Sequence, residues 1–113
     1  MSKRDELIAK YAADMKDKCG VTADTDLLTK VVVGLGPAVY NADASTVSGT
    51  DASELATIKK NFLMGKLGLS ESDNLDGAID SVIEKYGKSN RNKYRAVVYY
   101  LLTKHFKKES VYS

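Results

Sequence analysis

Apolar residues recur at helical spacing along most of the chain, and this period restricts the fold more than any other feature of the sequence. Over residues 4–18 the apolar stripe is formed by Leu7, Ile8, Tyr11 and Met15. Such a stripe is typical of a helix that buries one face. Alternation with the period of a strand does not persist over any useful length. We therefore predict an all-α fold.

The pattern predicts five main helices and one short helix in a single domain. A chain of 113 residues is long enough to bury one hydrophobic core and too short to favour two. We therefore treat residues 1–113 as one compact helical bundle, whose packing order the pattern does not give. The main helices are expected at 4–18, 26–33, 52–67, 75–86 and 91–108, and the short one at 37–42.

Residues that favour helix ends separate these segments. Glycines that suit the end of a helix follow three of the five main segments, and side chains that can cap a helix start precede four of them. The expected caps are Asp24 or Thr22, Thr50 or Asp51, Ser70 or Ser72, and Ser89 or Asn90, and the expected stops are Gly20, Gly68 and Gly87.

The second segment is the one place where a strand competes with a helix. It contains three consecutive valines, at 31–33, and β-branched residues favour strands. Leu27, Leu28, Val31 and Val32 nevertheless keep helical spacing, and no partner strand is evident. We predict a helix here.

The linker after this segment contains two features that we weighed as sites. Gly34 and Gly36 are followed by Pro37, and proline suits the first turn of a helix. This stretch lacks the Lys and Ser/Thr of a phosphate-binding loop, so we interpret it as a turn. Residues 41–51 are rich in hydroxyl groups and form the longest connection, and such loops often carry function. The sequence does not decide whether this loop is a site.

The residue inventory argues against a metal or cofactor site and against an enzyme. The single histidine, His105, and the single cysteine, Cys19, are not part of a spaced ligand set. A calcium loop beginning at Asp43 fails, because Val47 and Ser48 occupy positions that need a ligand and a glycine. Cys19 ends a predicted helix, where the dipole disfavours a thiolate. We expect it to be partly buried and inert.

Two further catalytic arrangements have simpler explanations. His105 falls on the expected inner side of the last helix, so we interpret it as a packed or edge imidazole. Asp76 and Asp80 share one helix face, which is typical of a solvated face rather than of an acid–base pair. We therefore expect no catalytic centre and no cofactor.

Charge is divided unevenly along the chain. Residues 1–84 carry 9 Lys and Arg against 14 Asp and Glu, whereas residues 85–113 carry 8 against 1, so the two parts have net charges of −5 and +7. This division favours an acidic protein partner or self-association, in which the acidic part of a second copy is the partner. Alternatively, the charges offset one another within the fold.

The basic part contains the candidate binding surface. On a helix over residues 91–108, one apolar face holds Tyr94, Val98, Leu102 and their neighbours, so this helix belongs to the core. Basic and tyrosine side chains fall on the opposite face and its margins. The candidate surface consists of Arg91, Lys93, Arg95, Tyr100, Lys104 and Lys107.

Two functions suit this surface. We predict protein–protein association through the basic C-terminal helix. The alternative is weak, sequence-independent nucleic-acid binding, because lysines beside an exposed Tyr100 can contact phosphates and stack a base. Lysines are also the ordinary covering of a helix's outer face, and those near its C-terminus complement the dipole.

The compartment is constrained only by general features. One cysteine excludes an internal disulfide and fits a reducing environment. The N-terminal residues have no apolar signal region, and the longest nearly apolar run, at 96–102, is too short to span a bilayer. We expect a cytoplasmic protein without a membrane partner.

Three long strings carry a resemblance to a known family. They are GPAVYNADASTVSGTD, ELATIKKNFLMGKLGL and KSNRNKYRAVVYYLLTKHFKKESVY. With them the chain resembles, over nearly its whole length, an uncharacterised bacterial family called domain of unknown function 2853. The resemblance implies a small, stand-alone bacterial protein and fits the helical prediction. It implies no activity, ligand or site residue.

Overall fold

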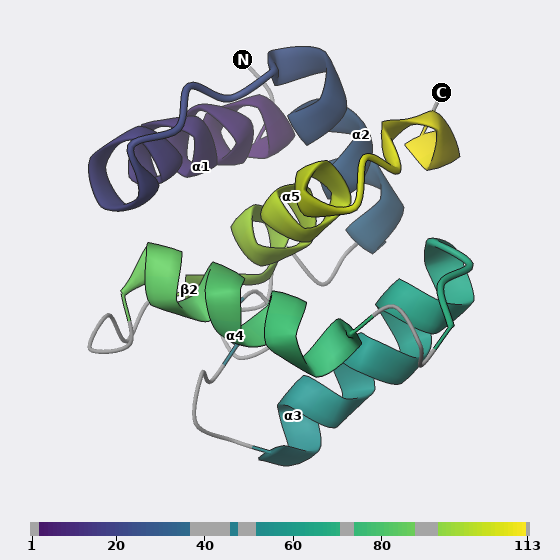
Figure 1. Cartoon of the computed structure of the whole chain (residues 1–113). Helices are drawn as coiled ribbons and strands as arrows, with labels where there is room; N and C mark the ends of the chain where they lie inside the picture. Colours follow the sequence, from purple (N-terminus) through teal and green to yellow (C-terminus); the bar gives the residue numbers. More distant parts are fainter. Residues whose placement is uncertain (1–2, 37–45, 48–51, 71–73, 88–92, 113) are drawn as a thin grey trace.

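The computed structural model confirms an all-α fold (Figure 1). It describes residues 3–36, 46–47, 52–70, 74–87 and 93–112. The predicted short helix at 37–42 lies outside these residues, as does all of the 41–51 loop except 46–47. The helices are α1 (Lys3–Cys19), α2 (Thr25–Leu35), α3 (Ala52–Thr57), which continues as η2 (Ile58–Lys66), α4 (Leu75–Tyr86), α5 (Arg95–His105) and the C-terminal turn η4 (Glu109–Tyr112).

The first two helices follow the sequence prediction closely. Helix α1 ends before Gly20, whose φ of +66° is readily adopted by glycine. Asp24 caps α2, since its carboxylate accepts hydrogen bonds from the backbone N–H groups of Asp26 and Leu27. The three valines are helical, with Val31 and Val32 buried and Val33 53% exposed. A helix with one strongly apolar face therefore prevails over the local strand preference.

The third predicted helix is only partly an α-helix. From Ile58 onward its hydrogen bonds are of the wider π type, and its last N–H, from Leu67, reaches the carbonyl of Phe62. Gly68, with φ of +70°, then reverses the chain, and Leu69 donates to the carbonyl of Leu63. Phe62 and its neighbour Leu63 are both buried in this segment.

The fourth helix has the predicted core and end but a different start. Asn74, in the left-handed region with φ of +54°, occupies its N-cap position without a capping side-chain hydrogen bond. The prediction of Ser70 or Ser72 as the cap is therefore wrong. Gly87, with φ of +102°, ends the helix as expected.

Helix α5 lies at the centre of the molecule and starts later than predicted. Residues 93–94 are extended and form β2 (Lys93–Tyr94), which pairs antiparallel with β1 (Thr46–Val47). The helix therefore starts at Arg95 rather than at residue 91. It packs against α1, α2 and α4, and Figure 1 shows it between the first two helices and α4.

The central place of α5 explains the composition of the core. Most of its side chains are buried, including Tyr100 and Thr103. The remaining core comes from the apolar stripes of the other helices. Because α5 has neighbours on several sides, only a narrow strip of its surface remains exposed, and this limits what it can present to a partner.

Candidate functional site

The structure does not bring the predicted surface residues onto one exposed face. Lys93 is 3% exposed and Tyr100 is 1% exposed, whereas Lys104 and Lys107 are exposed. Arg91 lies outside the described residues. The expectation of an exposed Lys93 and Tyr100 is therefore wrong, because the extended residues before Arg95 interrupt the helical phase and because α5 packs on several sides.

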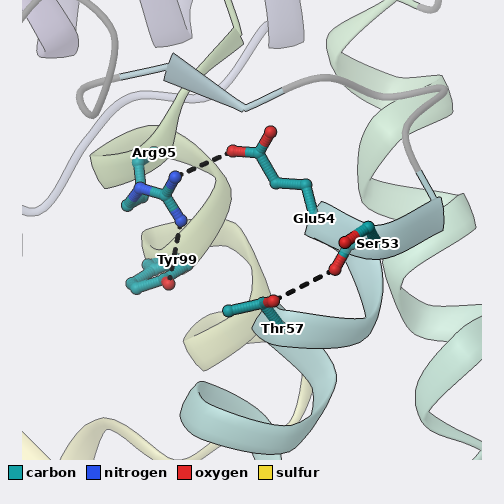
Figure 2. Close-up of polar contacts among 5 residues, drawn as sticks. All are labelled: Ser53, Glu54, Thr57, Arg95 and Tyr99. Carbon is teal, nitrogen blue, oxygen red and sulfur yellow. Dashed lines mark hydrogen bonds and ion pairs between the residues drawn. The ribbon is translucent and has the colours of Figure 1, made fainter.

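The first turn of α5 is held by polar contacts (Figure 2) and by an aromatic stack. The Arg95 guanidinium pairs with Glu54 of α3 at 2.8 Å and donates to the Tyr99 hydroxyl at 3.3 Å. The Tyr99 ring stacks on Phe62 with centroids 4.0 Å apart. The side chains of Arg95 and Glu54 are only 17% and 26% exposed. This charge therefore joins α5 to α3 and is not presented at an open surface.

A tyrosine–carboxylate contact fixes the residues immediately before α5. The Tyr86 hydroxyl donates to Asp14 of α1 and accepts from the backbone N–H of Tyr94 at 3.2 Å. Burial, and then the hydrogen bond to Asp14, raises the pKa of Tyr86 well above its usual value. Burial also lowers the pKa of Lys93. Both groups belong to the packed interior.

The middle of α5 is tied to α2 through Tyr100. Its hydroxyl accepts a hydrogen bond from the backbone N–H of Asp24 at 2.7 Å. Asp24 itself caps α2, so Tyr100 fixes the start of that helix from a position 76 residues away in sequence. The role that sequence suggested for Tyr100, stacking on a base, is incompatible with this buried position.

The last turns of α5 form one wall of a groove, which we call the α4–α5 groove. It has a volume of about 380 Å³. Its polar wall consists of Ser81 and Lys85 of α4 and Lys104 and His105 of α5. Its apolar lining consists of Val21, Val82, Leu101 and the ring of Tyr100. None of these lining residues is acidic, so the groove is suited to an anionic group that carries an apolar portion.

Glu109 pairs with one of these cations from outside the groove. Its carboxylate lies 3.6 Å from the Lys104 ammonium, and both side chains are 43% exposed. An exposed pair of this kind contributes about 0–1 kcal/mol. A carboxylate of a ligand can therefore replace Glu109 at little cost.

The structure also places the residues weighed for catalysis. Cys19 is partly buried, as predicted, and burial followed by the nearby Asp14 raises the pKa of its thiol. His105 is exposed rather than packed inward, with its ring edge-on to Phe106. In the described part of the chain, no three His, Cys, Asp or Glu side chains gather as metal ligands.

Sequence reasoning missed Ser81 and Lys85, and it left open whether His105 is packed or at the edge, where the structure leaves the side chain exposed. Helical spacing shows that Ser81 and Lys85 share a face of α4, but it does not show which helix that face meets. The lysine and histidine of α5 meet them only because α4 and α5 pack together. Of the predicted surface residues, the groove contains Tyr100 and Lys104.

No described helix is both long and apolar enough to cross a membrane.

Comparison with known proteins gives a family without an assigned activity. No curated protein matches the chain. The family model described as "Protein of unknown function (DUF2853)" matches residues 10–110. This match includes both walls of the α4–α5 groove and all helices except the start of α1 and the end of η4. The chain belongs to the DUF2853 family of proteins of unknown function.

Proposed function

We propose that this protein is a non-enzymatic binding module whose α4–α5 groove receives an acidic segment of a partner protein. The composition of the groove carries the proposal. Lys85, Lys104 and His105 surround an apolar lining, and none of the described lining residues is acidic. A cytoplasmic location, suggested by the single cysteine, is part of the same proposal.

The mixed lining favours a protein segment over a nucleic acid. A glutamate or aspartate beside an aliphatic residue offers a carboxylate to the lysines and an apolar group to Val82 and Leu101. Single-stranded nucleic acid is usually held by exposed rings and a row of phosphate contacts. Tyr100 is buried, and Lys93, which belonged to the expected row, is buried too.

The partner segment has two sources, and both have the same chemistry. It belongs either to a different protein or to a second copy of this chain. Helix α4 exposes Asp80 and Glu84, which are acidic groups that a second copy can present. Self-association is therefore one form of this proposal, and the measurements below separate it from the other.

The test is fluorescence anisotropy with a labelled peptide of alternating Glu and Leu. We expect binding that weakens as salt increases, because the contacts are largely between charges. The double variant Lys85→Gln/Lys104→Gln should weaken binding about tenfold, since it removes two partly exposed ion pairs. The control Arg4→Gln/Lys60→Gln removes the same charge from exposed positions of α1 and η2 and should bind as the parent protein does.

The remaining outcomes decide among the partners. Peptide binding that the Lys85/Lys104 double variant leaves intact would contradict the proposal. Tighter binding of an oligonucleotide than of the peptide, at physiological salt, would replace it with nucleic-acid binding. Sedimentation equilibrium distinguishes a second copy of this chain from a different protein as the partner. A dimer that dissociates in the same double variant would identify the partner as a second copy.

A further inference from the structure

Two hollows lie between α2, η2 and the C-terminal turn η4, apart from the α4–α5 groove. Their volumes are about 180 Å³ and 330 Å³. Both are lined by Gly34, Lys66 and Tyr112. They are therefore neighbouring parts of one depression, and we call it the aromatic depression.

The smaller hollow is lined by three aromatic rings. Phe62 and Tyr99, which stack on each other, meet Tyr112 there. Asn61 adds a polar group at its edge. Rings in this number favour a flat aromatic ligand, because offset and edge-on ring contacts add to the energy of apolar burial.

The larger hollow adds positive charge and an exposed apolar side chain. Lys30 and Lys66 line it together with Val33, the large apolar side chain that is 53% exposed. The Lys66 ammonium lies 4.9 Å from the centre of the Tyr112 ring. Such an exposed cation–π contact contributes about 0.5–1 kcal/mol, so Lys66 can turn toward an anion at little cost. Of the described residues, none that lines either hollow is acidic.

Gly34 keeps the two hollows open. A Cβ atom at this position would lie 3.5 Å from Cε1 of Tyr112, which is an ordinary van der Waals contact. Because Gly34 lines both hollows, a bulky side chain such as leucine at this position would fill part of the depression. Gly34 is the next-to-last residue of α2, and glycine favours a helix less than alanine does. Space next to Tyr112 is thus retained at the expense of helix propensity.

We propose that the aromatic depression binds a small, flat aromatic carboxylate. The ring lies against Phe62, Tyr99 and Tyr112, and the carboxylate accepts hydrogen bonds from Lys66, with Lys30 as the second cation. Rings and cations are adjacent here, with no acidic side chain among the described lining residues, and this complementarity of shape and charge selects that class of ligand. The inference uses other residues than the α4–α5 groove and stands or falls independently of it.

The phenol of Tyr112 supports this assignment. Burial and the neighbouring Tyr99 raise the pKa of Tyr112 to about 12. Its hydroxyl, which an ordinary tyrosine pKa of about 10 already keeps protonated at neutral pH, adds no negative charge that would repel a carboxylate.

The test is a titration of the ¹⁵N-labelled protein with indole-3-acetate, followed by amide chemical shifts. We expect saturable shifts at Gly34, Lys66 and Tyr112, with a dissociation constant between about 10 µM and about 1 mM for a ligand of this size. Lys66→Gln should weaken binding about fivefold. Lys60→Gln, on the same helix and exposed but outside both hollows, should leave it unchanged.

A pair of variants at Gly34 tests the space rather than the charge. Gly34→Leu should abolish binding by filling the depression, whereas Gly34→Ala should retain it. Both favour the helix more than glycine does, so the spectrum of each should show a folded protein. Equal shifts with the neutral analogue indole-3-acetamide would overturn the proposal. So would binding that survives both Gly34→Leu and Lys66→Gln, shifts confined to the α4–α5 groove, or no saturable shift at millimolar ligand.

Discussion

The two ends of α5 carry similar side chains but use them differently. At the first turn, Arg95 and Tyr99 are held by Glu54 and Phe62 and join the helix to α3 and η2. At the last turn, Lys104 and His105 are exposed and line a groove. Basic and aromatic side chains therefore pack against other helices at the first turn, whereas basic side chains are exposed to solvent at the last turn. The neighbours of each turn, rather than the residue types, decide between these uses.

Substitutions at the two ends of α5 should therefore change the stability of the protein by different amounts. Removing one member of a buried polar contact leaves its partner desolvated and unpaired, which costs about 1–3 kcal/mol. Removing an exposed lysine changes stability by about 0.5 kcal/mol or less. Stability should thus depend on the first turn, and binding on the last.

The largest effect is expected where the first turn meets η2. Phe62→Ala removes a buried ring, 4% exposed, on which Tyr99 stacks. We expect a loss of about 3–5 kcal/mol in the free energy of unfolding, measured by chemical denaturation. Val33→Ala, at a 53% exposed position, is the control and should change little. A loss below about 1 kcal/mol for Phe62→Ala would show that η2 repacks and that this end is not rigidly held.

A matched pair of charge substitutions compares the two ends directly. Arg95→Met should destabilise the protein by about 1–3 kcal/mol, because Glu54 keeps its charge in a partly buried position. Lys104→Met, whose partner Glu109 is 43% exposed, should change stability by about 0.5 kcal/mol or less. Equal losses in the two variants, measured by urea unfolding, would remove the distinction between the ends.

Alkaline pH tests whether the C-terminal turn belongs to the packed part of the molecule. The pKa of Tyr112 is about 12 in the folded protein and about 10 in an unfolded chain. Between these values the unfolded state binds fewer protons, so the stabilisation present below pH 10 is lost as the pH rises. We expect the titration of Tyr112 to lower the free energy of unfolding by about 1 kcal/mol between pH 8 and pH 11.

Tyr112→Phe isolates that contribution, because the raised pKa of Tyr86 acts in the same direction in both proteins. Unfolding free energies at pH 8 and pH 11, measured on the parent protein and the variant, give the difference. A variant that loses as much stability as the parent would show that the Tyr112 phenol is solvated and that η4 is not packed.

The smallest effect is expected at the rim of the α4–α5 groove. Glu109→Gln removes the carboxylate that competes for Lys104. Because an exposed pair contributes at most about 1 kcal/mol, binding of the acidic peptide should tighten by about two- to fivefold. Ser110→Ala, at the exposed next position, serves as the control in the same anisotropy assay. Weaker binding in Glu109→Gln would indicate that Glu109 orients Lys104 instead of competing for it.

The helices could be read from the sequence because their signals are local. The apolar stripe with Leu27, Leu28, Val31 and Val32 is the buried face of α2. Asp24 and three glycines mark ends where they were expected. Periodicity and capping depend on residues within one or two turns, and these neighbours are visible in the sequence.

The errors arose where distant residues determine the local conformation. Lys93 and Tyr94 are extended because they pair with Val47 and Thr46, and the Tyr94 N–H is held by Tyr86. A helical wheel continued through these residues therefore has the wrong phase. The π-type turns of η2 likewise have no local sequence signal, although Ile58, Phe62 and Leu67 are buried as helical spacing predicts.

The sequence by itself determined that this chain is all-α, where most of its helices lie, and that its positive charge is concentrated after residue 84. Only the tertiary structure decided which of those charges are open to a partner. Burial depends on how many helices surround a residue, and α5 is enclosed by α1, α2 and α4. Periodicity identifies one buried face of a helix, but it cannot show that Tyr100, on the opposite face, is buried by α2. The groove combines Lys85 with Lys104 for the same reason, because packing rather than spacing brings these residues together.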